Sequence, residues 1–194
     1  MLPTRLSRFA IVTLALVAIA CGDLSRKANY SNALQSFSLF ALTGAPVNTP
    51  TAIELLGGTT TADGSYRFDV ALDLDSLGQT RVYPVRTIAG ALSTLRGERS
   101  RVGLQVVPGT FDALTEAPAT GYDTLGFKVI RANDVLAIEV QDLTTCIYST
   151  RGYFIYGKLT VDSVRTADRR IFGRIVVDRN CGFRGLTPDV VPTN

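Results

Sequence analysis

The sequence predicts an all-β protein, an antiparallel β-sandwich or open barrel of about eight strands with one disulfide. Residues 65–75 alternate strictly between two sets of side chains, which is typical of a strand with one buried and one solvated face. Similar short segments recur between polar turns, and no segment predicts the helical crossovers that a parallel α/β fold needs. Two cysteines near the C-terminus, Cys146 and Cys181, are the candidates for the disulfide.

The first half of the folded region predicts strands at residues 34–42, 52–56, 65–75 and 80–88. In the third, the buried side comprises Tyr66, Phe68, Val70, Leu72 and Leu74, and the solvated side comprises Arg67, Asp69, Ala71, Asp73 and Asp75. Pro84 makes the fourth an edge strand, because proline cannot donate to a central ladder. Residues 85–95 also fit a helical stripe, but Gly90 and the β-branched side chains argue against a helix.

The second half predicts strands at residues 101–107, 135–140, 153–164 and 171–178. The last two form a hairpin, because the residues between them are a short polar turn. Residues 111–126 are interpreted as a loop with one helical turn at 112–116, and residues 186–194 as a tail. Three aromatic side chains within 153–156 point to both faces of a strand, so one of those faces is a candidate interface.

The N-terminus has the pattern of an export signal. Arg5 and Arg8 precede an uncharged run over residues 9–20, which is too short to span a bilayer and has the length of a signal-peptide core. The run ends at Cys21, with Ala18 and Ala20 before it. Residues 1–21 resemble the bacterial lipoprotein class, whose lipobox usually reads Leu-Ala-Gly-Cys or Leu-Ala-Ala-Cys. Ala18 stands here where that pattern has leucine. The alternative is an ordinary secretory signal with a chance cysteine near the cut.

The resemblance implies cleavage before Cys21 and acylation of that cysteine, which would anchor the chain without a transmembrane helix. The expected organisation is a signal peptide at 1–20, a lipidated cysteine and flexible tether at 21–33, and a single β-rich domain at 34–194. The expected location is the bacterial cell envelope. Gly22 stands where aspartate would retain a lipoprotein at the inner membrane, so the outer membrane is favoured.

Composition excludes several function classes. Without Arg5 and Arg8, the chain carries 18 basic and 17 acidic residues, so its charge gives no reason to expect nucleic acid as a partner. The sequence has no histidine, which removes Ser-His-Asp and Cys-His catalysis and the commonest metal ligand. We therefore expect no metal and no cofactor.

The cysteine count predicts one structural disulfide. If Cys21 is acylated, Cys146 and Cys181 remain to pair in an oxidising compartment. In the chain-entropy model, closing a loop of this size stabilises the fold by roughly 3–4 kcal/mol. We expect no redox role, because there is no Cys-x-x-Cys spacing and no histidine to lower a thiol pKa.

Two local patterns are weaker. Residues 59–68 resemble the hairpin of carboxypeptidase regulatory-like, prealbumin-type modules, which often reads Thr-Asp-x-x-Gly-x-Tyr-x-Phe, and this supports a sandwich. Residues 73–78 begin like a calcium loop, but Leu77 and Pro84 occupy positions that need oxygen ligands. We interpret that segment as a solvated strand end followed by a turn.

Two sets of charged residues are candidates for chemistry. Carboxylates on or beside predicted strands could pair for glycoside hydrolysis, but no spacing selects a pair, so we interpret them as solvated strand faces: Asp69, Asp73, Asp75, Glu139, Asp142 and Asp162. Arg96, Arg99 and Arg101 form a charged loop that could bind a phosphate or carboxylate.

The predicted function is a non-catalytic binding or structural module of an envelope lipoprotein. Its expected partners are the membrane, through acyl chains on Cys21, and an envelope protein. Two alternatives stay open: an envelope hydrolase that uses paired carboxylates, and an accessory subunit of an outer-membrane assembly.

Overall fold

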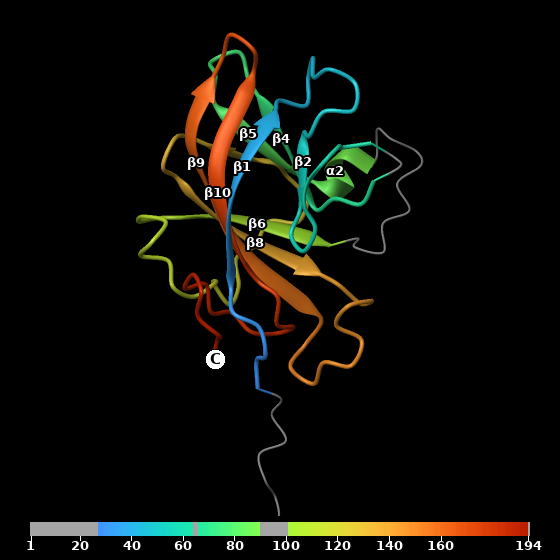
Figure 1. Ribbon diagram of the computed structural model, residues 1–194, viewed down its shortest axis with the longest axis vertical. Helices are drawn as coiled ribbons and strands as arrows, with labels where there is room; N and C mark the ends of the chain where they lie inside the picture. The colour runs from blue at the N-terminus through green and yellow to red at the C-terminus, as the bar shows by residue number, and fades with distance from the viewer. Residues whose placement is uncertain (1–26, 64–65, 90–100, 194) are drawn as a thin grey trace, which may run out of the picture.

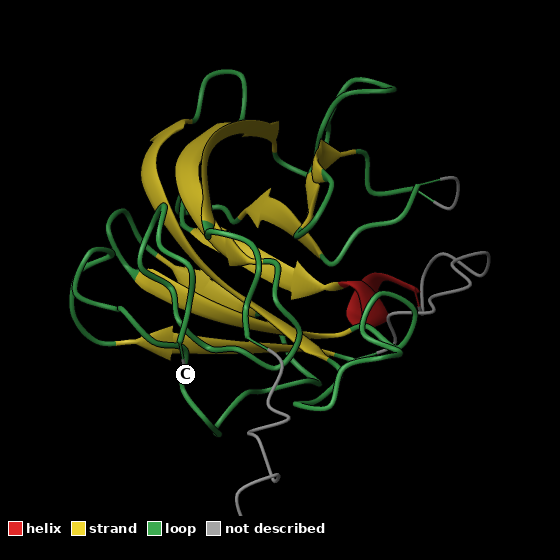
Figure 2. Ribbon diagram, turned by 60° about the horizontal axis from the view of Figure 1, so that its bottom comes forward, coloured by secondary structure: helices red, strands yellow, loops and turns green. Residues whose placement is uncertain are grey.

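The computed structural model describes residues 27–63, 66–89 and 101–193, which form two five-stranded antiparallel sheets (Figures 1 and 2). The first sheet has the order β1-β10-β9-β8-β6. Its strands are β1 (Ala33–Phe40), β6 (Val102–Val107), β8 (Val135–Gln141), β9 (Phe154–Arg165) and β10 (Arg170–Asp178). The second has the order β3-β2-β4-β5-β7. Its strands are β2 (Ala52–Glu54), β3 (Gly58–Thr60), β4 (Val70–Leu74), β5 (Thr80–Pro84) and β7 (Lys128–Ile130). The prediction of an antiparallel all-β fold is confirmed.

One continuous apolar core fills the space between the two sheets. Its fully buried side chains come from both: Leu39, Leu104, Leu136 and Leu159 from the first sheet, and Ile53, Leu72 and Ile130 from the second. Burial of one such side chain stabilises the fold by about 1.5–3 kcal/mol. Of the alternating segment 65–75, Val70, Leu72 and Leu74 lie in this core as predicted. Ala71, predicted to be solvated, lies there too, and Tyr66, predicted to be buried, is exposed.

The second sheet differs from the prediction at its short strands. β3 and β7 contain three residues each and were not predicted, because alternation is not detectable over so short a run. β4 begins at Val70 rather than residue 65. Asp69 was predicted to be solvated but is fully buried, and the Leu55 N–H, which donates to its Oδ2 over 2.7 Å, replaces part of its lost hydration. Neighbouring side chains, which point to opposite faces of the sheet, are therefore both buried where β4 begins.

The prediction that residues 80–88 form an edge strand is wrong. β5 pairs with β4 on one side and β7 on the other. β7 pairs only with Thr80, Arg81 and Val82 of β5, so no β7 residue lies opposite Pro84. The missing N–H of the proline therefore breaks no hydrogen bond to β7. Beyond Pro84 the chain forms the short helix α2 (Val85–Ala89), the part of the apolar stripe that precedes Gly90.

The predicted C-terminal hairpin is confirmed, with β9 and β10 joined by a turn between Arg165 and Arg170. β1 lies along the other side of β10 over eight residue pairs, from Ala33 opposite Val177 to Phe40 opposite Arg170. The N-terminal strand is therefore the edge of the first sheet. The residues just before it meet the residues just after β10.

The outer face of the first sheet is also covered. Two small apolar clusters join β8, β9 and β10 to the loop before β7 and to the C-terminal segment, through Phe111, Leu114, Ala117 and Leu186. Lys158 on β9 lies beneath this cover with 0% of its surface exposed. The predicted helical turn at 112–116 begins earlier, since Ala113 and Leu114 both donate from their backbone N–H groups to the Thr110 carbonyl.

Candidate functional site

The chain enters the domain beside the end of β10, where Asn180 holds it. The N–H groups of Asn29 and Tyr30 donate to Asn180 Oδ1 over 2.8 and 3.0 Å, and Asn180 Nδ2 donates to the Tyr30 carbonyl over 2.8 Å. Asn32 is buried and donates to the carbonyls of Gly185 and Thr187. The segment predicted as a tether is therefore attached to the domain from Asn29 onward. Cys21 and residues 1–20 lie outside the described residues.

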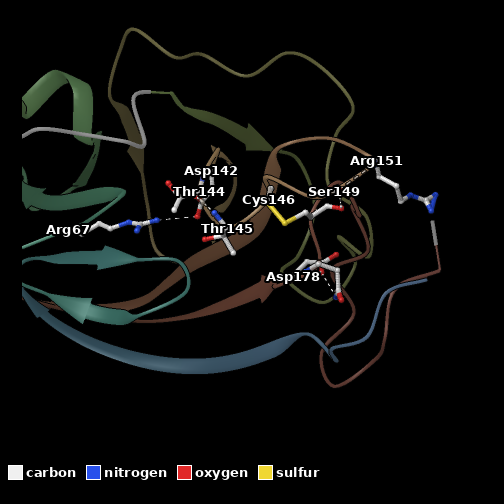
Figure 3. Close-up of a disulfide and its surroundings, with 10 residues drawn as sticks. Arg67, Asp142, Thr144, Thr145, Cys146, Ser149, Arg151 and Asp178 are labelled. Carbon is white, nitrogen blue, oxygen red and sulfur yellow. Dashed lines mark hydrogen bonds and ion pairs between the residues drawn. A yellow bond between two sulfur atoms is a disulfide. The ribbon is translucent and has the colours of Figure 1, made fainter. Parts of the chain in front are cut away.

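The disulfide lies at the same end of the first sheet as Asn180, and Figure 3 shows its surroundings. Cys146 and Cys181 are bonded, with their Cα atoms 5.6 Å apart, so the predicted pairing is confirmed. Cys146 lies in the loop after β8 and Cys181 lies just after β10, and β9 separates these two strands in the sheet. The bond therefore spans the end of β9. Ser149 adds a hydrogen bond from its hydroxyl to the Cys181 carbonyl.

Asp142 fixes the start of the loop that contains Cys146. Its Oδ1 accepts the N–H groups of Thr144 and Thr145 over 3.1 and 2.9 Å, an arrangement typical of an aspartate that initiates a turn. Its Oδ2 forms an ion pair with Arg67 at 3.1 Å, and Arg67 also pairs with Glu54 at 3.2 Å. Asp142 was predicted to be solvated, but only 1% of its surface is exposed. The carboxylate ties this loop to the second sheet.

Asp178 is a buried carboxylate that no pattern in the sequence indicated. Its Oδ1 accepts the backbone N–H and the side-chain Nδ2 of Asn180, both over 2.8 Å. Within the described ranges its Oδ2 has no hydrogen-bond partner. Burial raises the pKa of Asp178 to about 6, although the hydrogen bonds from Asn180 act in the opposite direction. Asp178 orients Asn180, which in turn holds the entering chain.

We expect Asp178 to make stability depend on pH. Its pKa is higher in the folded protein than its ordinary value of 3.8, so between about pH 4 and 6 the folded chain keeps a proton that the unfolded chain has lost. The free energy of unfolding should therefore fall as the pH rises through this window. Asp178→Asn should remove that contribution. Denaturant unfolding at several pH values measures it, with Asp162→Asn on an exposed ion pair as control. Parallel pH profiles for wild type and Asp178→Asn would contradict the prediction.

The surface around the disulfide is apolar and basic. A cavity of about 350 Å³ lies there, lined among others by Lys27, Tyr30, Tyr148, Arg151 and Arg179. Tyr148 is 79% exposed and its neighbour Ile147 is 58% exposed. The Arg151 guanidinium lies over the Phe183 ring at 4.2 Å. No carboxylate belongs to the lining that the described residues provide.

A second polar cluster lies on the covered outer face of the first sheet. Burial raises the pKa of Glu139, while a hydrogen bond with Tyr156 and the charge of Arg101 act against this rise. Burial and the nearby Glu139 raise the pKa of Tyr156 to about 12. Glu139 was predicted to be solvated but is only 7% exposed, because the loop before β7 and the C-terminal segment cover this face. These groups are held in a packed layer between sheet and loop.

Of the predicted arginine loop, the structure describes Arg101 alone. Arg101 lies 4.0 Å from Glu139 and stacks at 5.6 Å on Phe154. Arg96 and Arg99 lie outside the described residues, so the ligand loop over Arg96, Arg99 and Arg101 stays a prediction.

In the calcium-like segment at residues 73–78, Asp73 accepts hydrogen bonds from Thr43 and Arg169, and Asp75 accepts the N–H groups of Leu77 and Gln79. Both aspartates thus stabilise turns.

The candidate carboxylates are dispersed over the fold. Asp142 lies on the Arg67 guanidinium, which also pairs with Glu54. Asp162 pairs with Arg174 on the surface. Among the described residues, no group of three or more histidine, cysteine, aspartate or glutamate side chains could hold a metal ion. The arrangement at Arg67 is an ionic bridge between the two sheets.

Comparison with protein-family models, with curated proteins and with solved structures gives no match for this chain. In the part of the chain that the structure describes, no helix has the length and apolar character needed to cross a membrane.

Proposed function

We propose that this chain is a cell-envelope lipoprotein, anchored through acyl chains on Cys21, whose β-sandwich acts as a non-catalytic binding or structural module. The observation that carries the proposal is the attachment of Asn29 and Tyr30 to Asn180. This attachment fixes the point at which a chain leading from a lipidated Cys21 would reach the folded domain.

The length of the connecting segment supports a close tether. Asn29 lies eight positions after Cys21, so eight Cα–Cα steps connect them. Fully extended, they span at most about 29 Å, and a flexible chain of that length averages about 15 Å. The disulfide end of the sandwich would therefore lie near the surface that holds the acyl chains.

The hydrolase alternative finds no comparable support. A retaining or inverting pair needs two carboxyl groups about 5–10 Å apart around a substrate, and one of them must be able to donate a proton. Glu54 and Asp142 instead share the Arg67 guanidinium as their ion-pair partner. A binding or structural role is consistent with this ionic bridge.

Replacing the proposed lipidation site tests the anchor directly. Cys21→Ala should abolish acylation and shift the protein from the membrane fraction to the soluble fraction. Mass spectrometry of the wild-type N-terminal peptide and detergent partitioning of both proteins measure this. Because Cys146 and Cys181 are bonded to each other, Cys21→Ala should leave the disulfide intact, which thiol counting checks. A wild-type protein without acyl mass, or a variant that partitions as wild type does, would refute the proposal.

A further inference from the structure

The loop after β8 presents apolar side chains to solvent at the disulfide end. Leu143, Ile147 and Tyr148 are all more than half exposed and lie within a six-residue stretch of one loop. The loop is held in place, since Asp142 binds its first backbone N–H groups and Cys146 is bonded to Cys181. A constrained loop that exposes apolar side chains is typical of a contact surface.

The surroundings of this loop are cationic. Lys27, Arg151 and Arg179 line the same cavity as Tyr30 and Tyr148. Tyrosines beside lysine and arginine side chains are the combination found where proteins meet the headgroup layer of a membrane. Basic residues close to such a surface are attracted to anionic lipids. The chemistry of the patch therefore fits an anionic bilayer surface.

The position of the patch relative to the N-terminus restricts its occupant. Tyr30 and Tyr148 line one cavity, and Tyr30 follows directly on Asn29, the point at which the entering chain is attached. Figure 1 shows the entering chain and the loop after β8 at the same lower end of the molecule, and the turn between β4 and β5 at the opposite end. A chain anchored at Cys21 reaches its membrane from this end.

We propose that the loop over residues 143–149 inserts into the interfacial layer of the membrane that holds the acylated Cys21. Ile147 and Tyr148 enter the layer, and Lys27, Arg151 and Arg179 contact anionic headgroups. The inference depends on the proposed lipidation. It adds a second contact that fixes the orientation of the sandwich on the bilayer, with the β4–β5 turn pointing away.

The absence of tryptophan from the sequence allows a direct test. Tyr148→Trp places a single fluorescent reporter in the loop, and Leu77→Trp places one in the β4–β5 turn. The two native side chains are 79% and 80% exposed, so the variants are matched. Gly78, next to Leu77, lies against Thr166 in the β9–β10 turn, far along the sheet from Cys181. Each mature, lipidated variant is reconstituted into vesicles of phosphatidylethanolamine and phosphatidylglycerol, with and without bromine on the acyl chains.

The expected result is loss of emission in brominated vesicles and a blue shift for Tyr148→Trp, with neither change for Leu77→Trp. Vesicles without phosphatidylglycerol should reduce the difference between the variants, because the cations then lose their partners. Equal, unquenched emission from both variants while the protein remains vesicle-bound would overturn the inference and leave the lipid anchor standing. Such a result would favour a protein partner for the loop. Protein that carries no acyl mass would overturn both proposals.

Discussion

Replacing Lys158 with alanine should lower the free energy of unfolding by about 3–5 kcal/mol, because the change removes a buried side chain and the hydrogen-bond donor of two carbonyls. Its ammonium group donates to the carbonyls of Phe111 and Leu114 over 2.7 and 2.9 Å. Without the lysine, these two carbonyls of the loop before β7 lose their hydrogen-bond donor, and the missing methylene groups leave a cavity. Unfolding in denaturant with the disulfide intact measures the loss.

The neighbours of Lys158 explain why its charge is tolerated in this layer. Its Nζ lies 4.5 Å from the centre of the Phe111 ring, and the Arg174 guanidinium lies 5.0 Å from the same ring. Burial lowers the pKa of Lys158, whereas the charge of Asp112 raises it. Cation–π contacts and two carbonyl acceptors thus replace part of the lost hydration. Lys158 pins the loop before β7 to the outer face of the first sheet.

Two further variants make the Lys158 prediction specific. Lys158→Met keeps most of the side-chain volume, so it should destabilise less than Lys158→Ala while still losing both hydrogen bonds. Lys128→Met is the matched control, because Lys128 is partly exposed and pairs with the partly exposed Asp123 at 2.7 Å. Such a pair contributes about 0–1 kcal/mol. A Lys158→Ala loss no larger than that of the control would contradict the assigned role.

The sequence pattern predicted the position of the longer strands. β8 and the β9–β10 hairpin were placed within one or two residues, because each strand is a mostly apolar run of at least seven residues bounded by polar turns. Assigning polar residues to solvent failed where a second layer covers the sheet. Glu139 and Asp142 were assigned to solvent because polar residues usually face water, yet a loop without periodicity covers the first and an ion pair with Arg67 fixes the second. Tertiary cover of this kind leaves no local signal.

The candidate site shows the same division. The Cys146–Cys181 pair followed from counting cysteines, a property of the sequence alone. Asn180 and Asp178 could not be found in that way. Their role depends on β1 pairing with β10, which brings Asn29 to within hydrogen-bond distance of a residue 151 positions later. A β1–β10 pairing could have been guessed from two apolar strands, but no feature of the sequence selects it from the other pairings.

Gly173→Ala should be the most damaging single-methyl change in the first sheet, with a loss of about 3 kcal/mol in the free energy of unfolding. A Cβ at this position would lie 2.2 Å from the Thr160 carbonyl oxygen and 2.5 Å from Phe37 Cζ. Gly173 and Phe37 are direct cross-strand partners, so the ring of Phe37 covers the glycine. The ring could rotate away, but the carbonyl belongs to the ladder between β9 and β10 and cannot move without breaking it.

Local geometry strengthens this expectation for Gly173. The register between β9 and β10 shifts between Phe172 and Gly173, which leaves Asp162 as an extra residue on β9. A bulge of this kind increases the local twist, and here it brings the backbone of β9 close to Gly173. Gly157→Ala is the matched control, because its Cβ would lie 3.1 Å from the Val176 carbonyl oxygen and 3.4 Å from Leu55 Cδ2. Thermal and denaturant unfolding should therefore rank wild type above Gly157→Ala and Gly157→Ala above Gly173→Ala. Equal stability of the two variants would show that the bulge can relax to accept a methyl group.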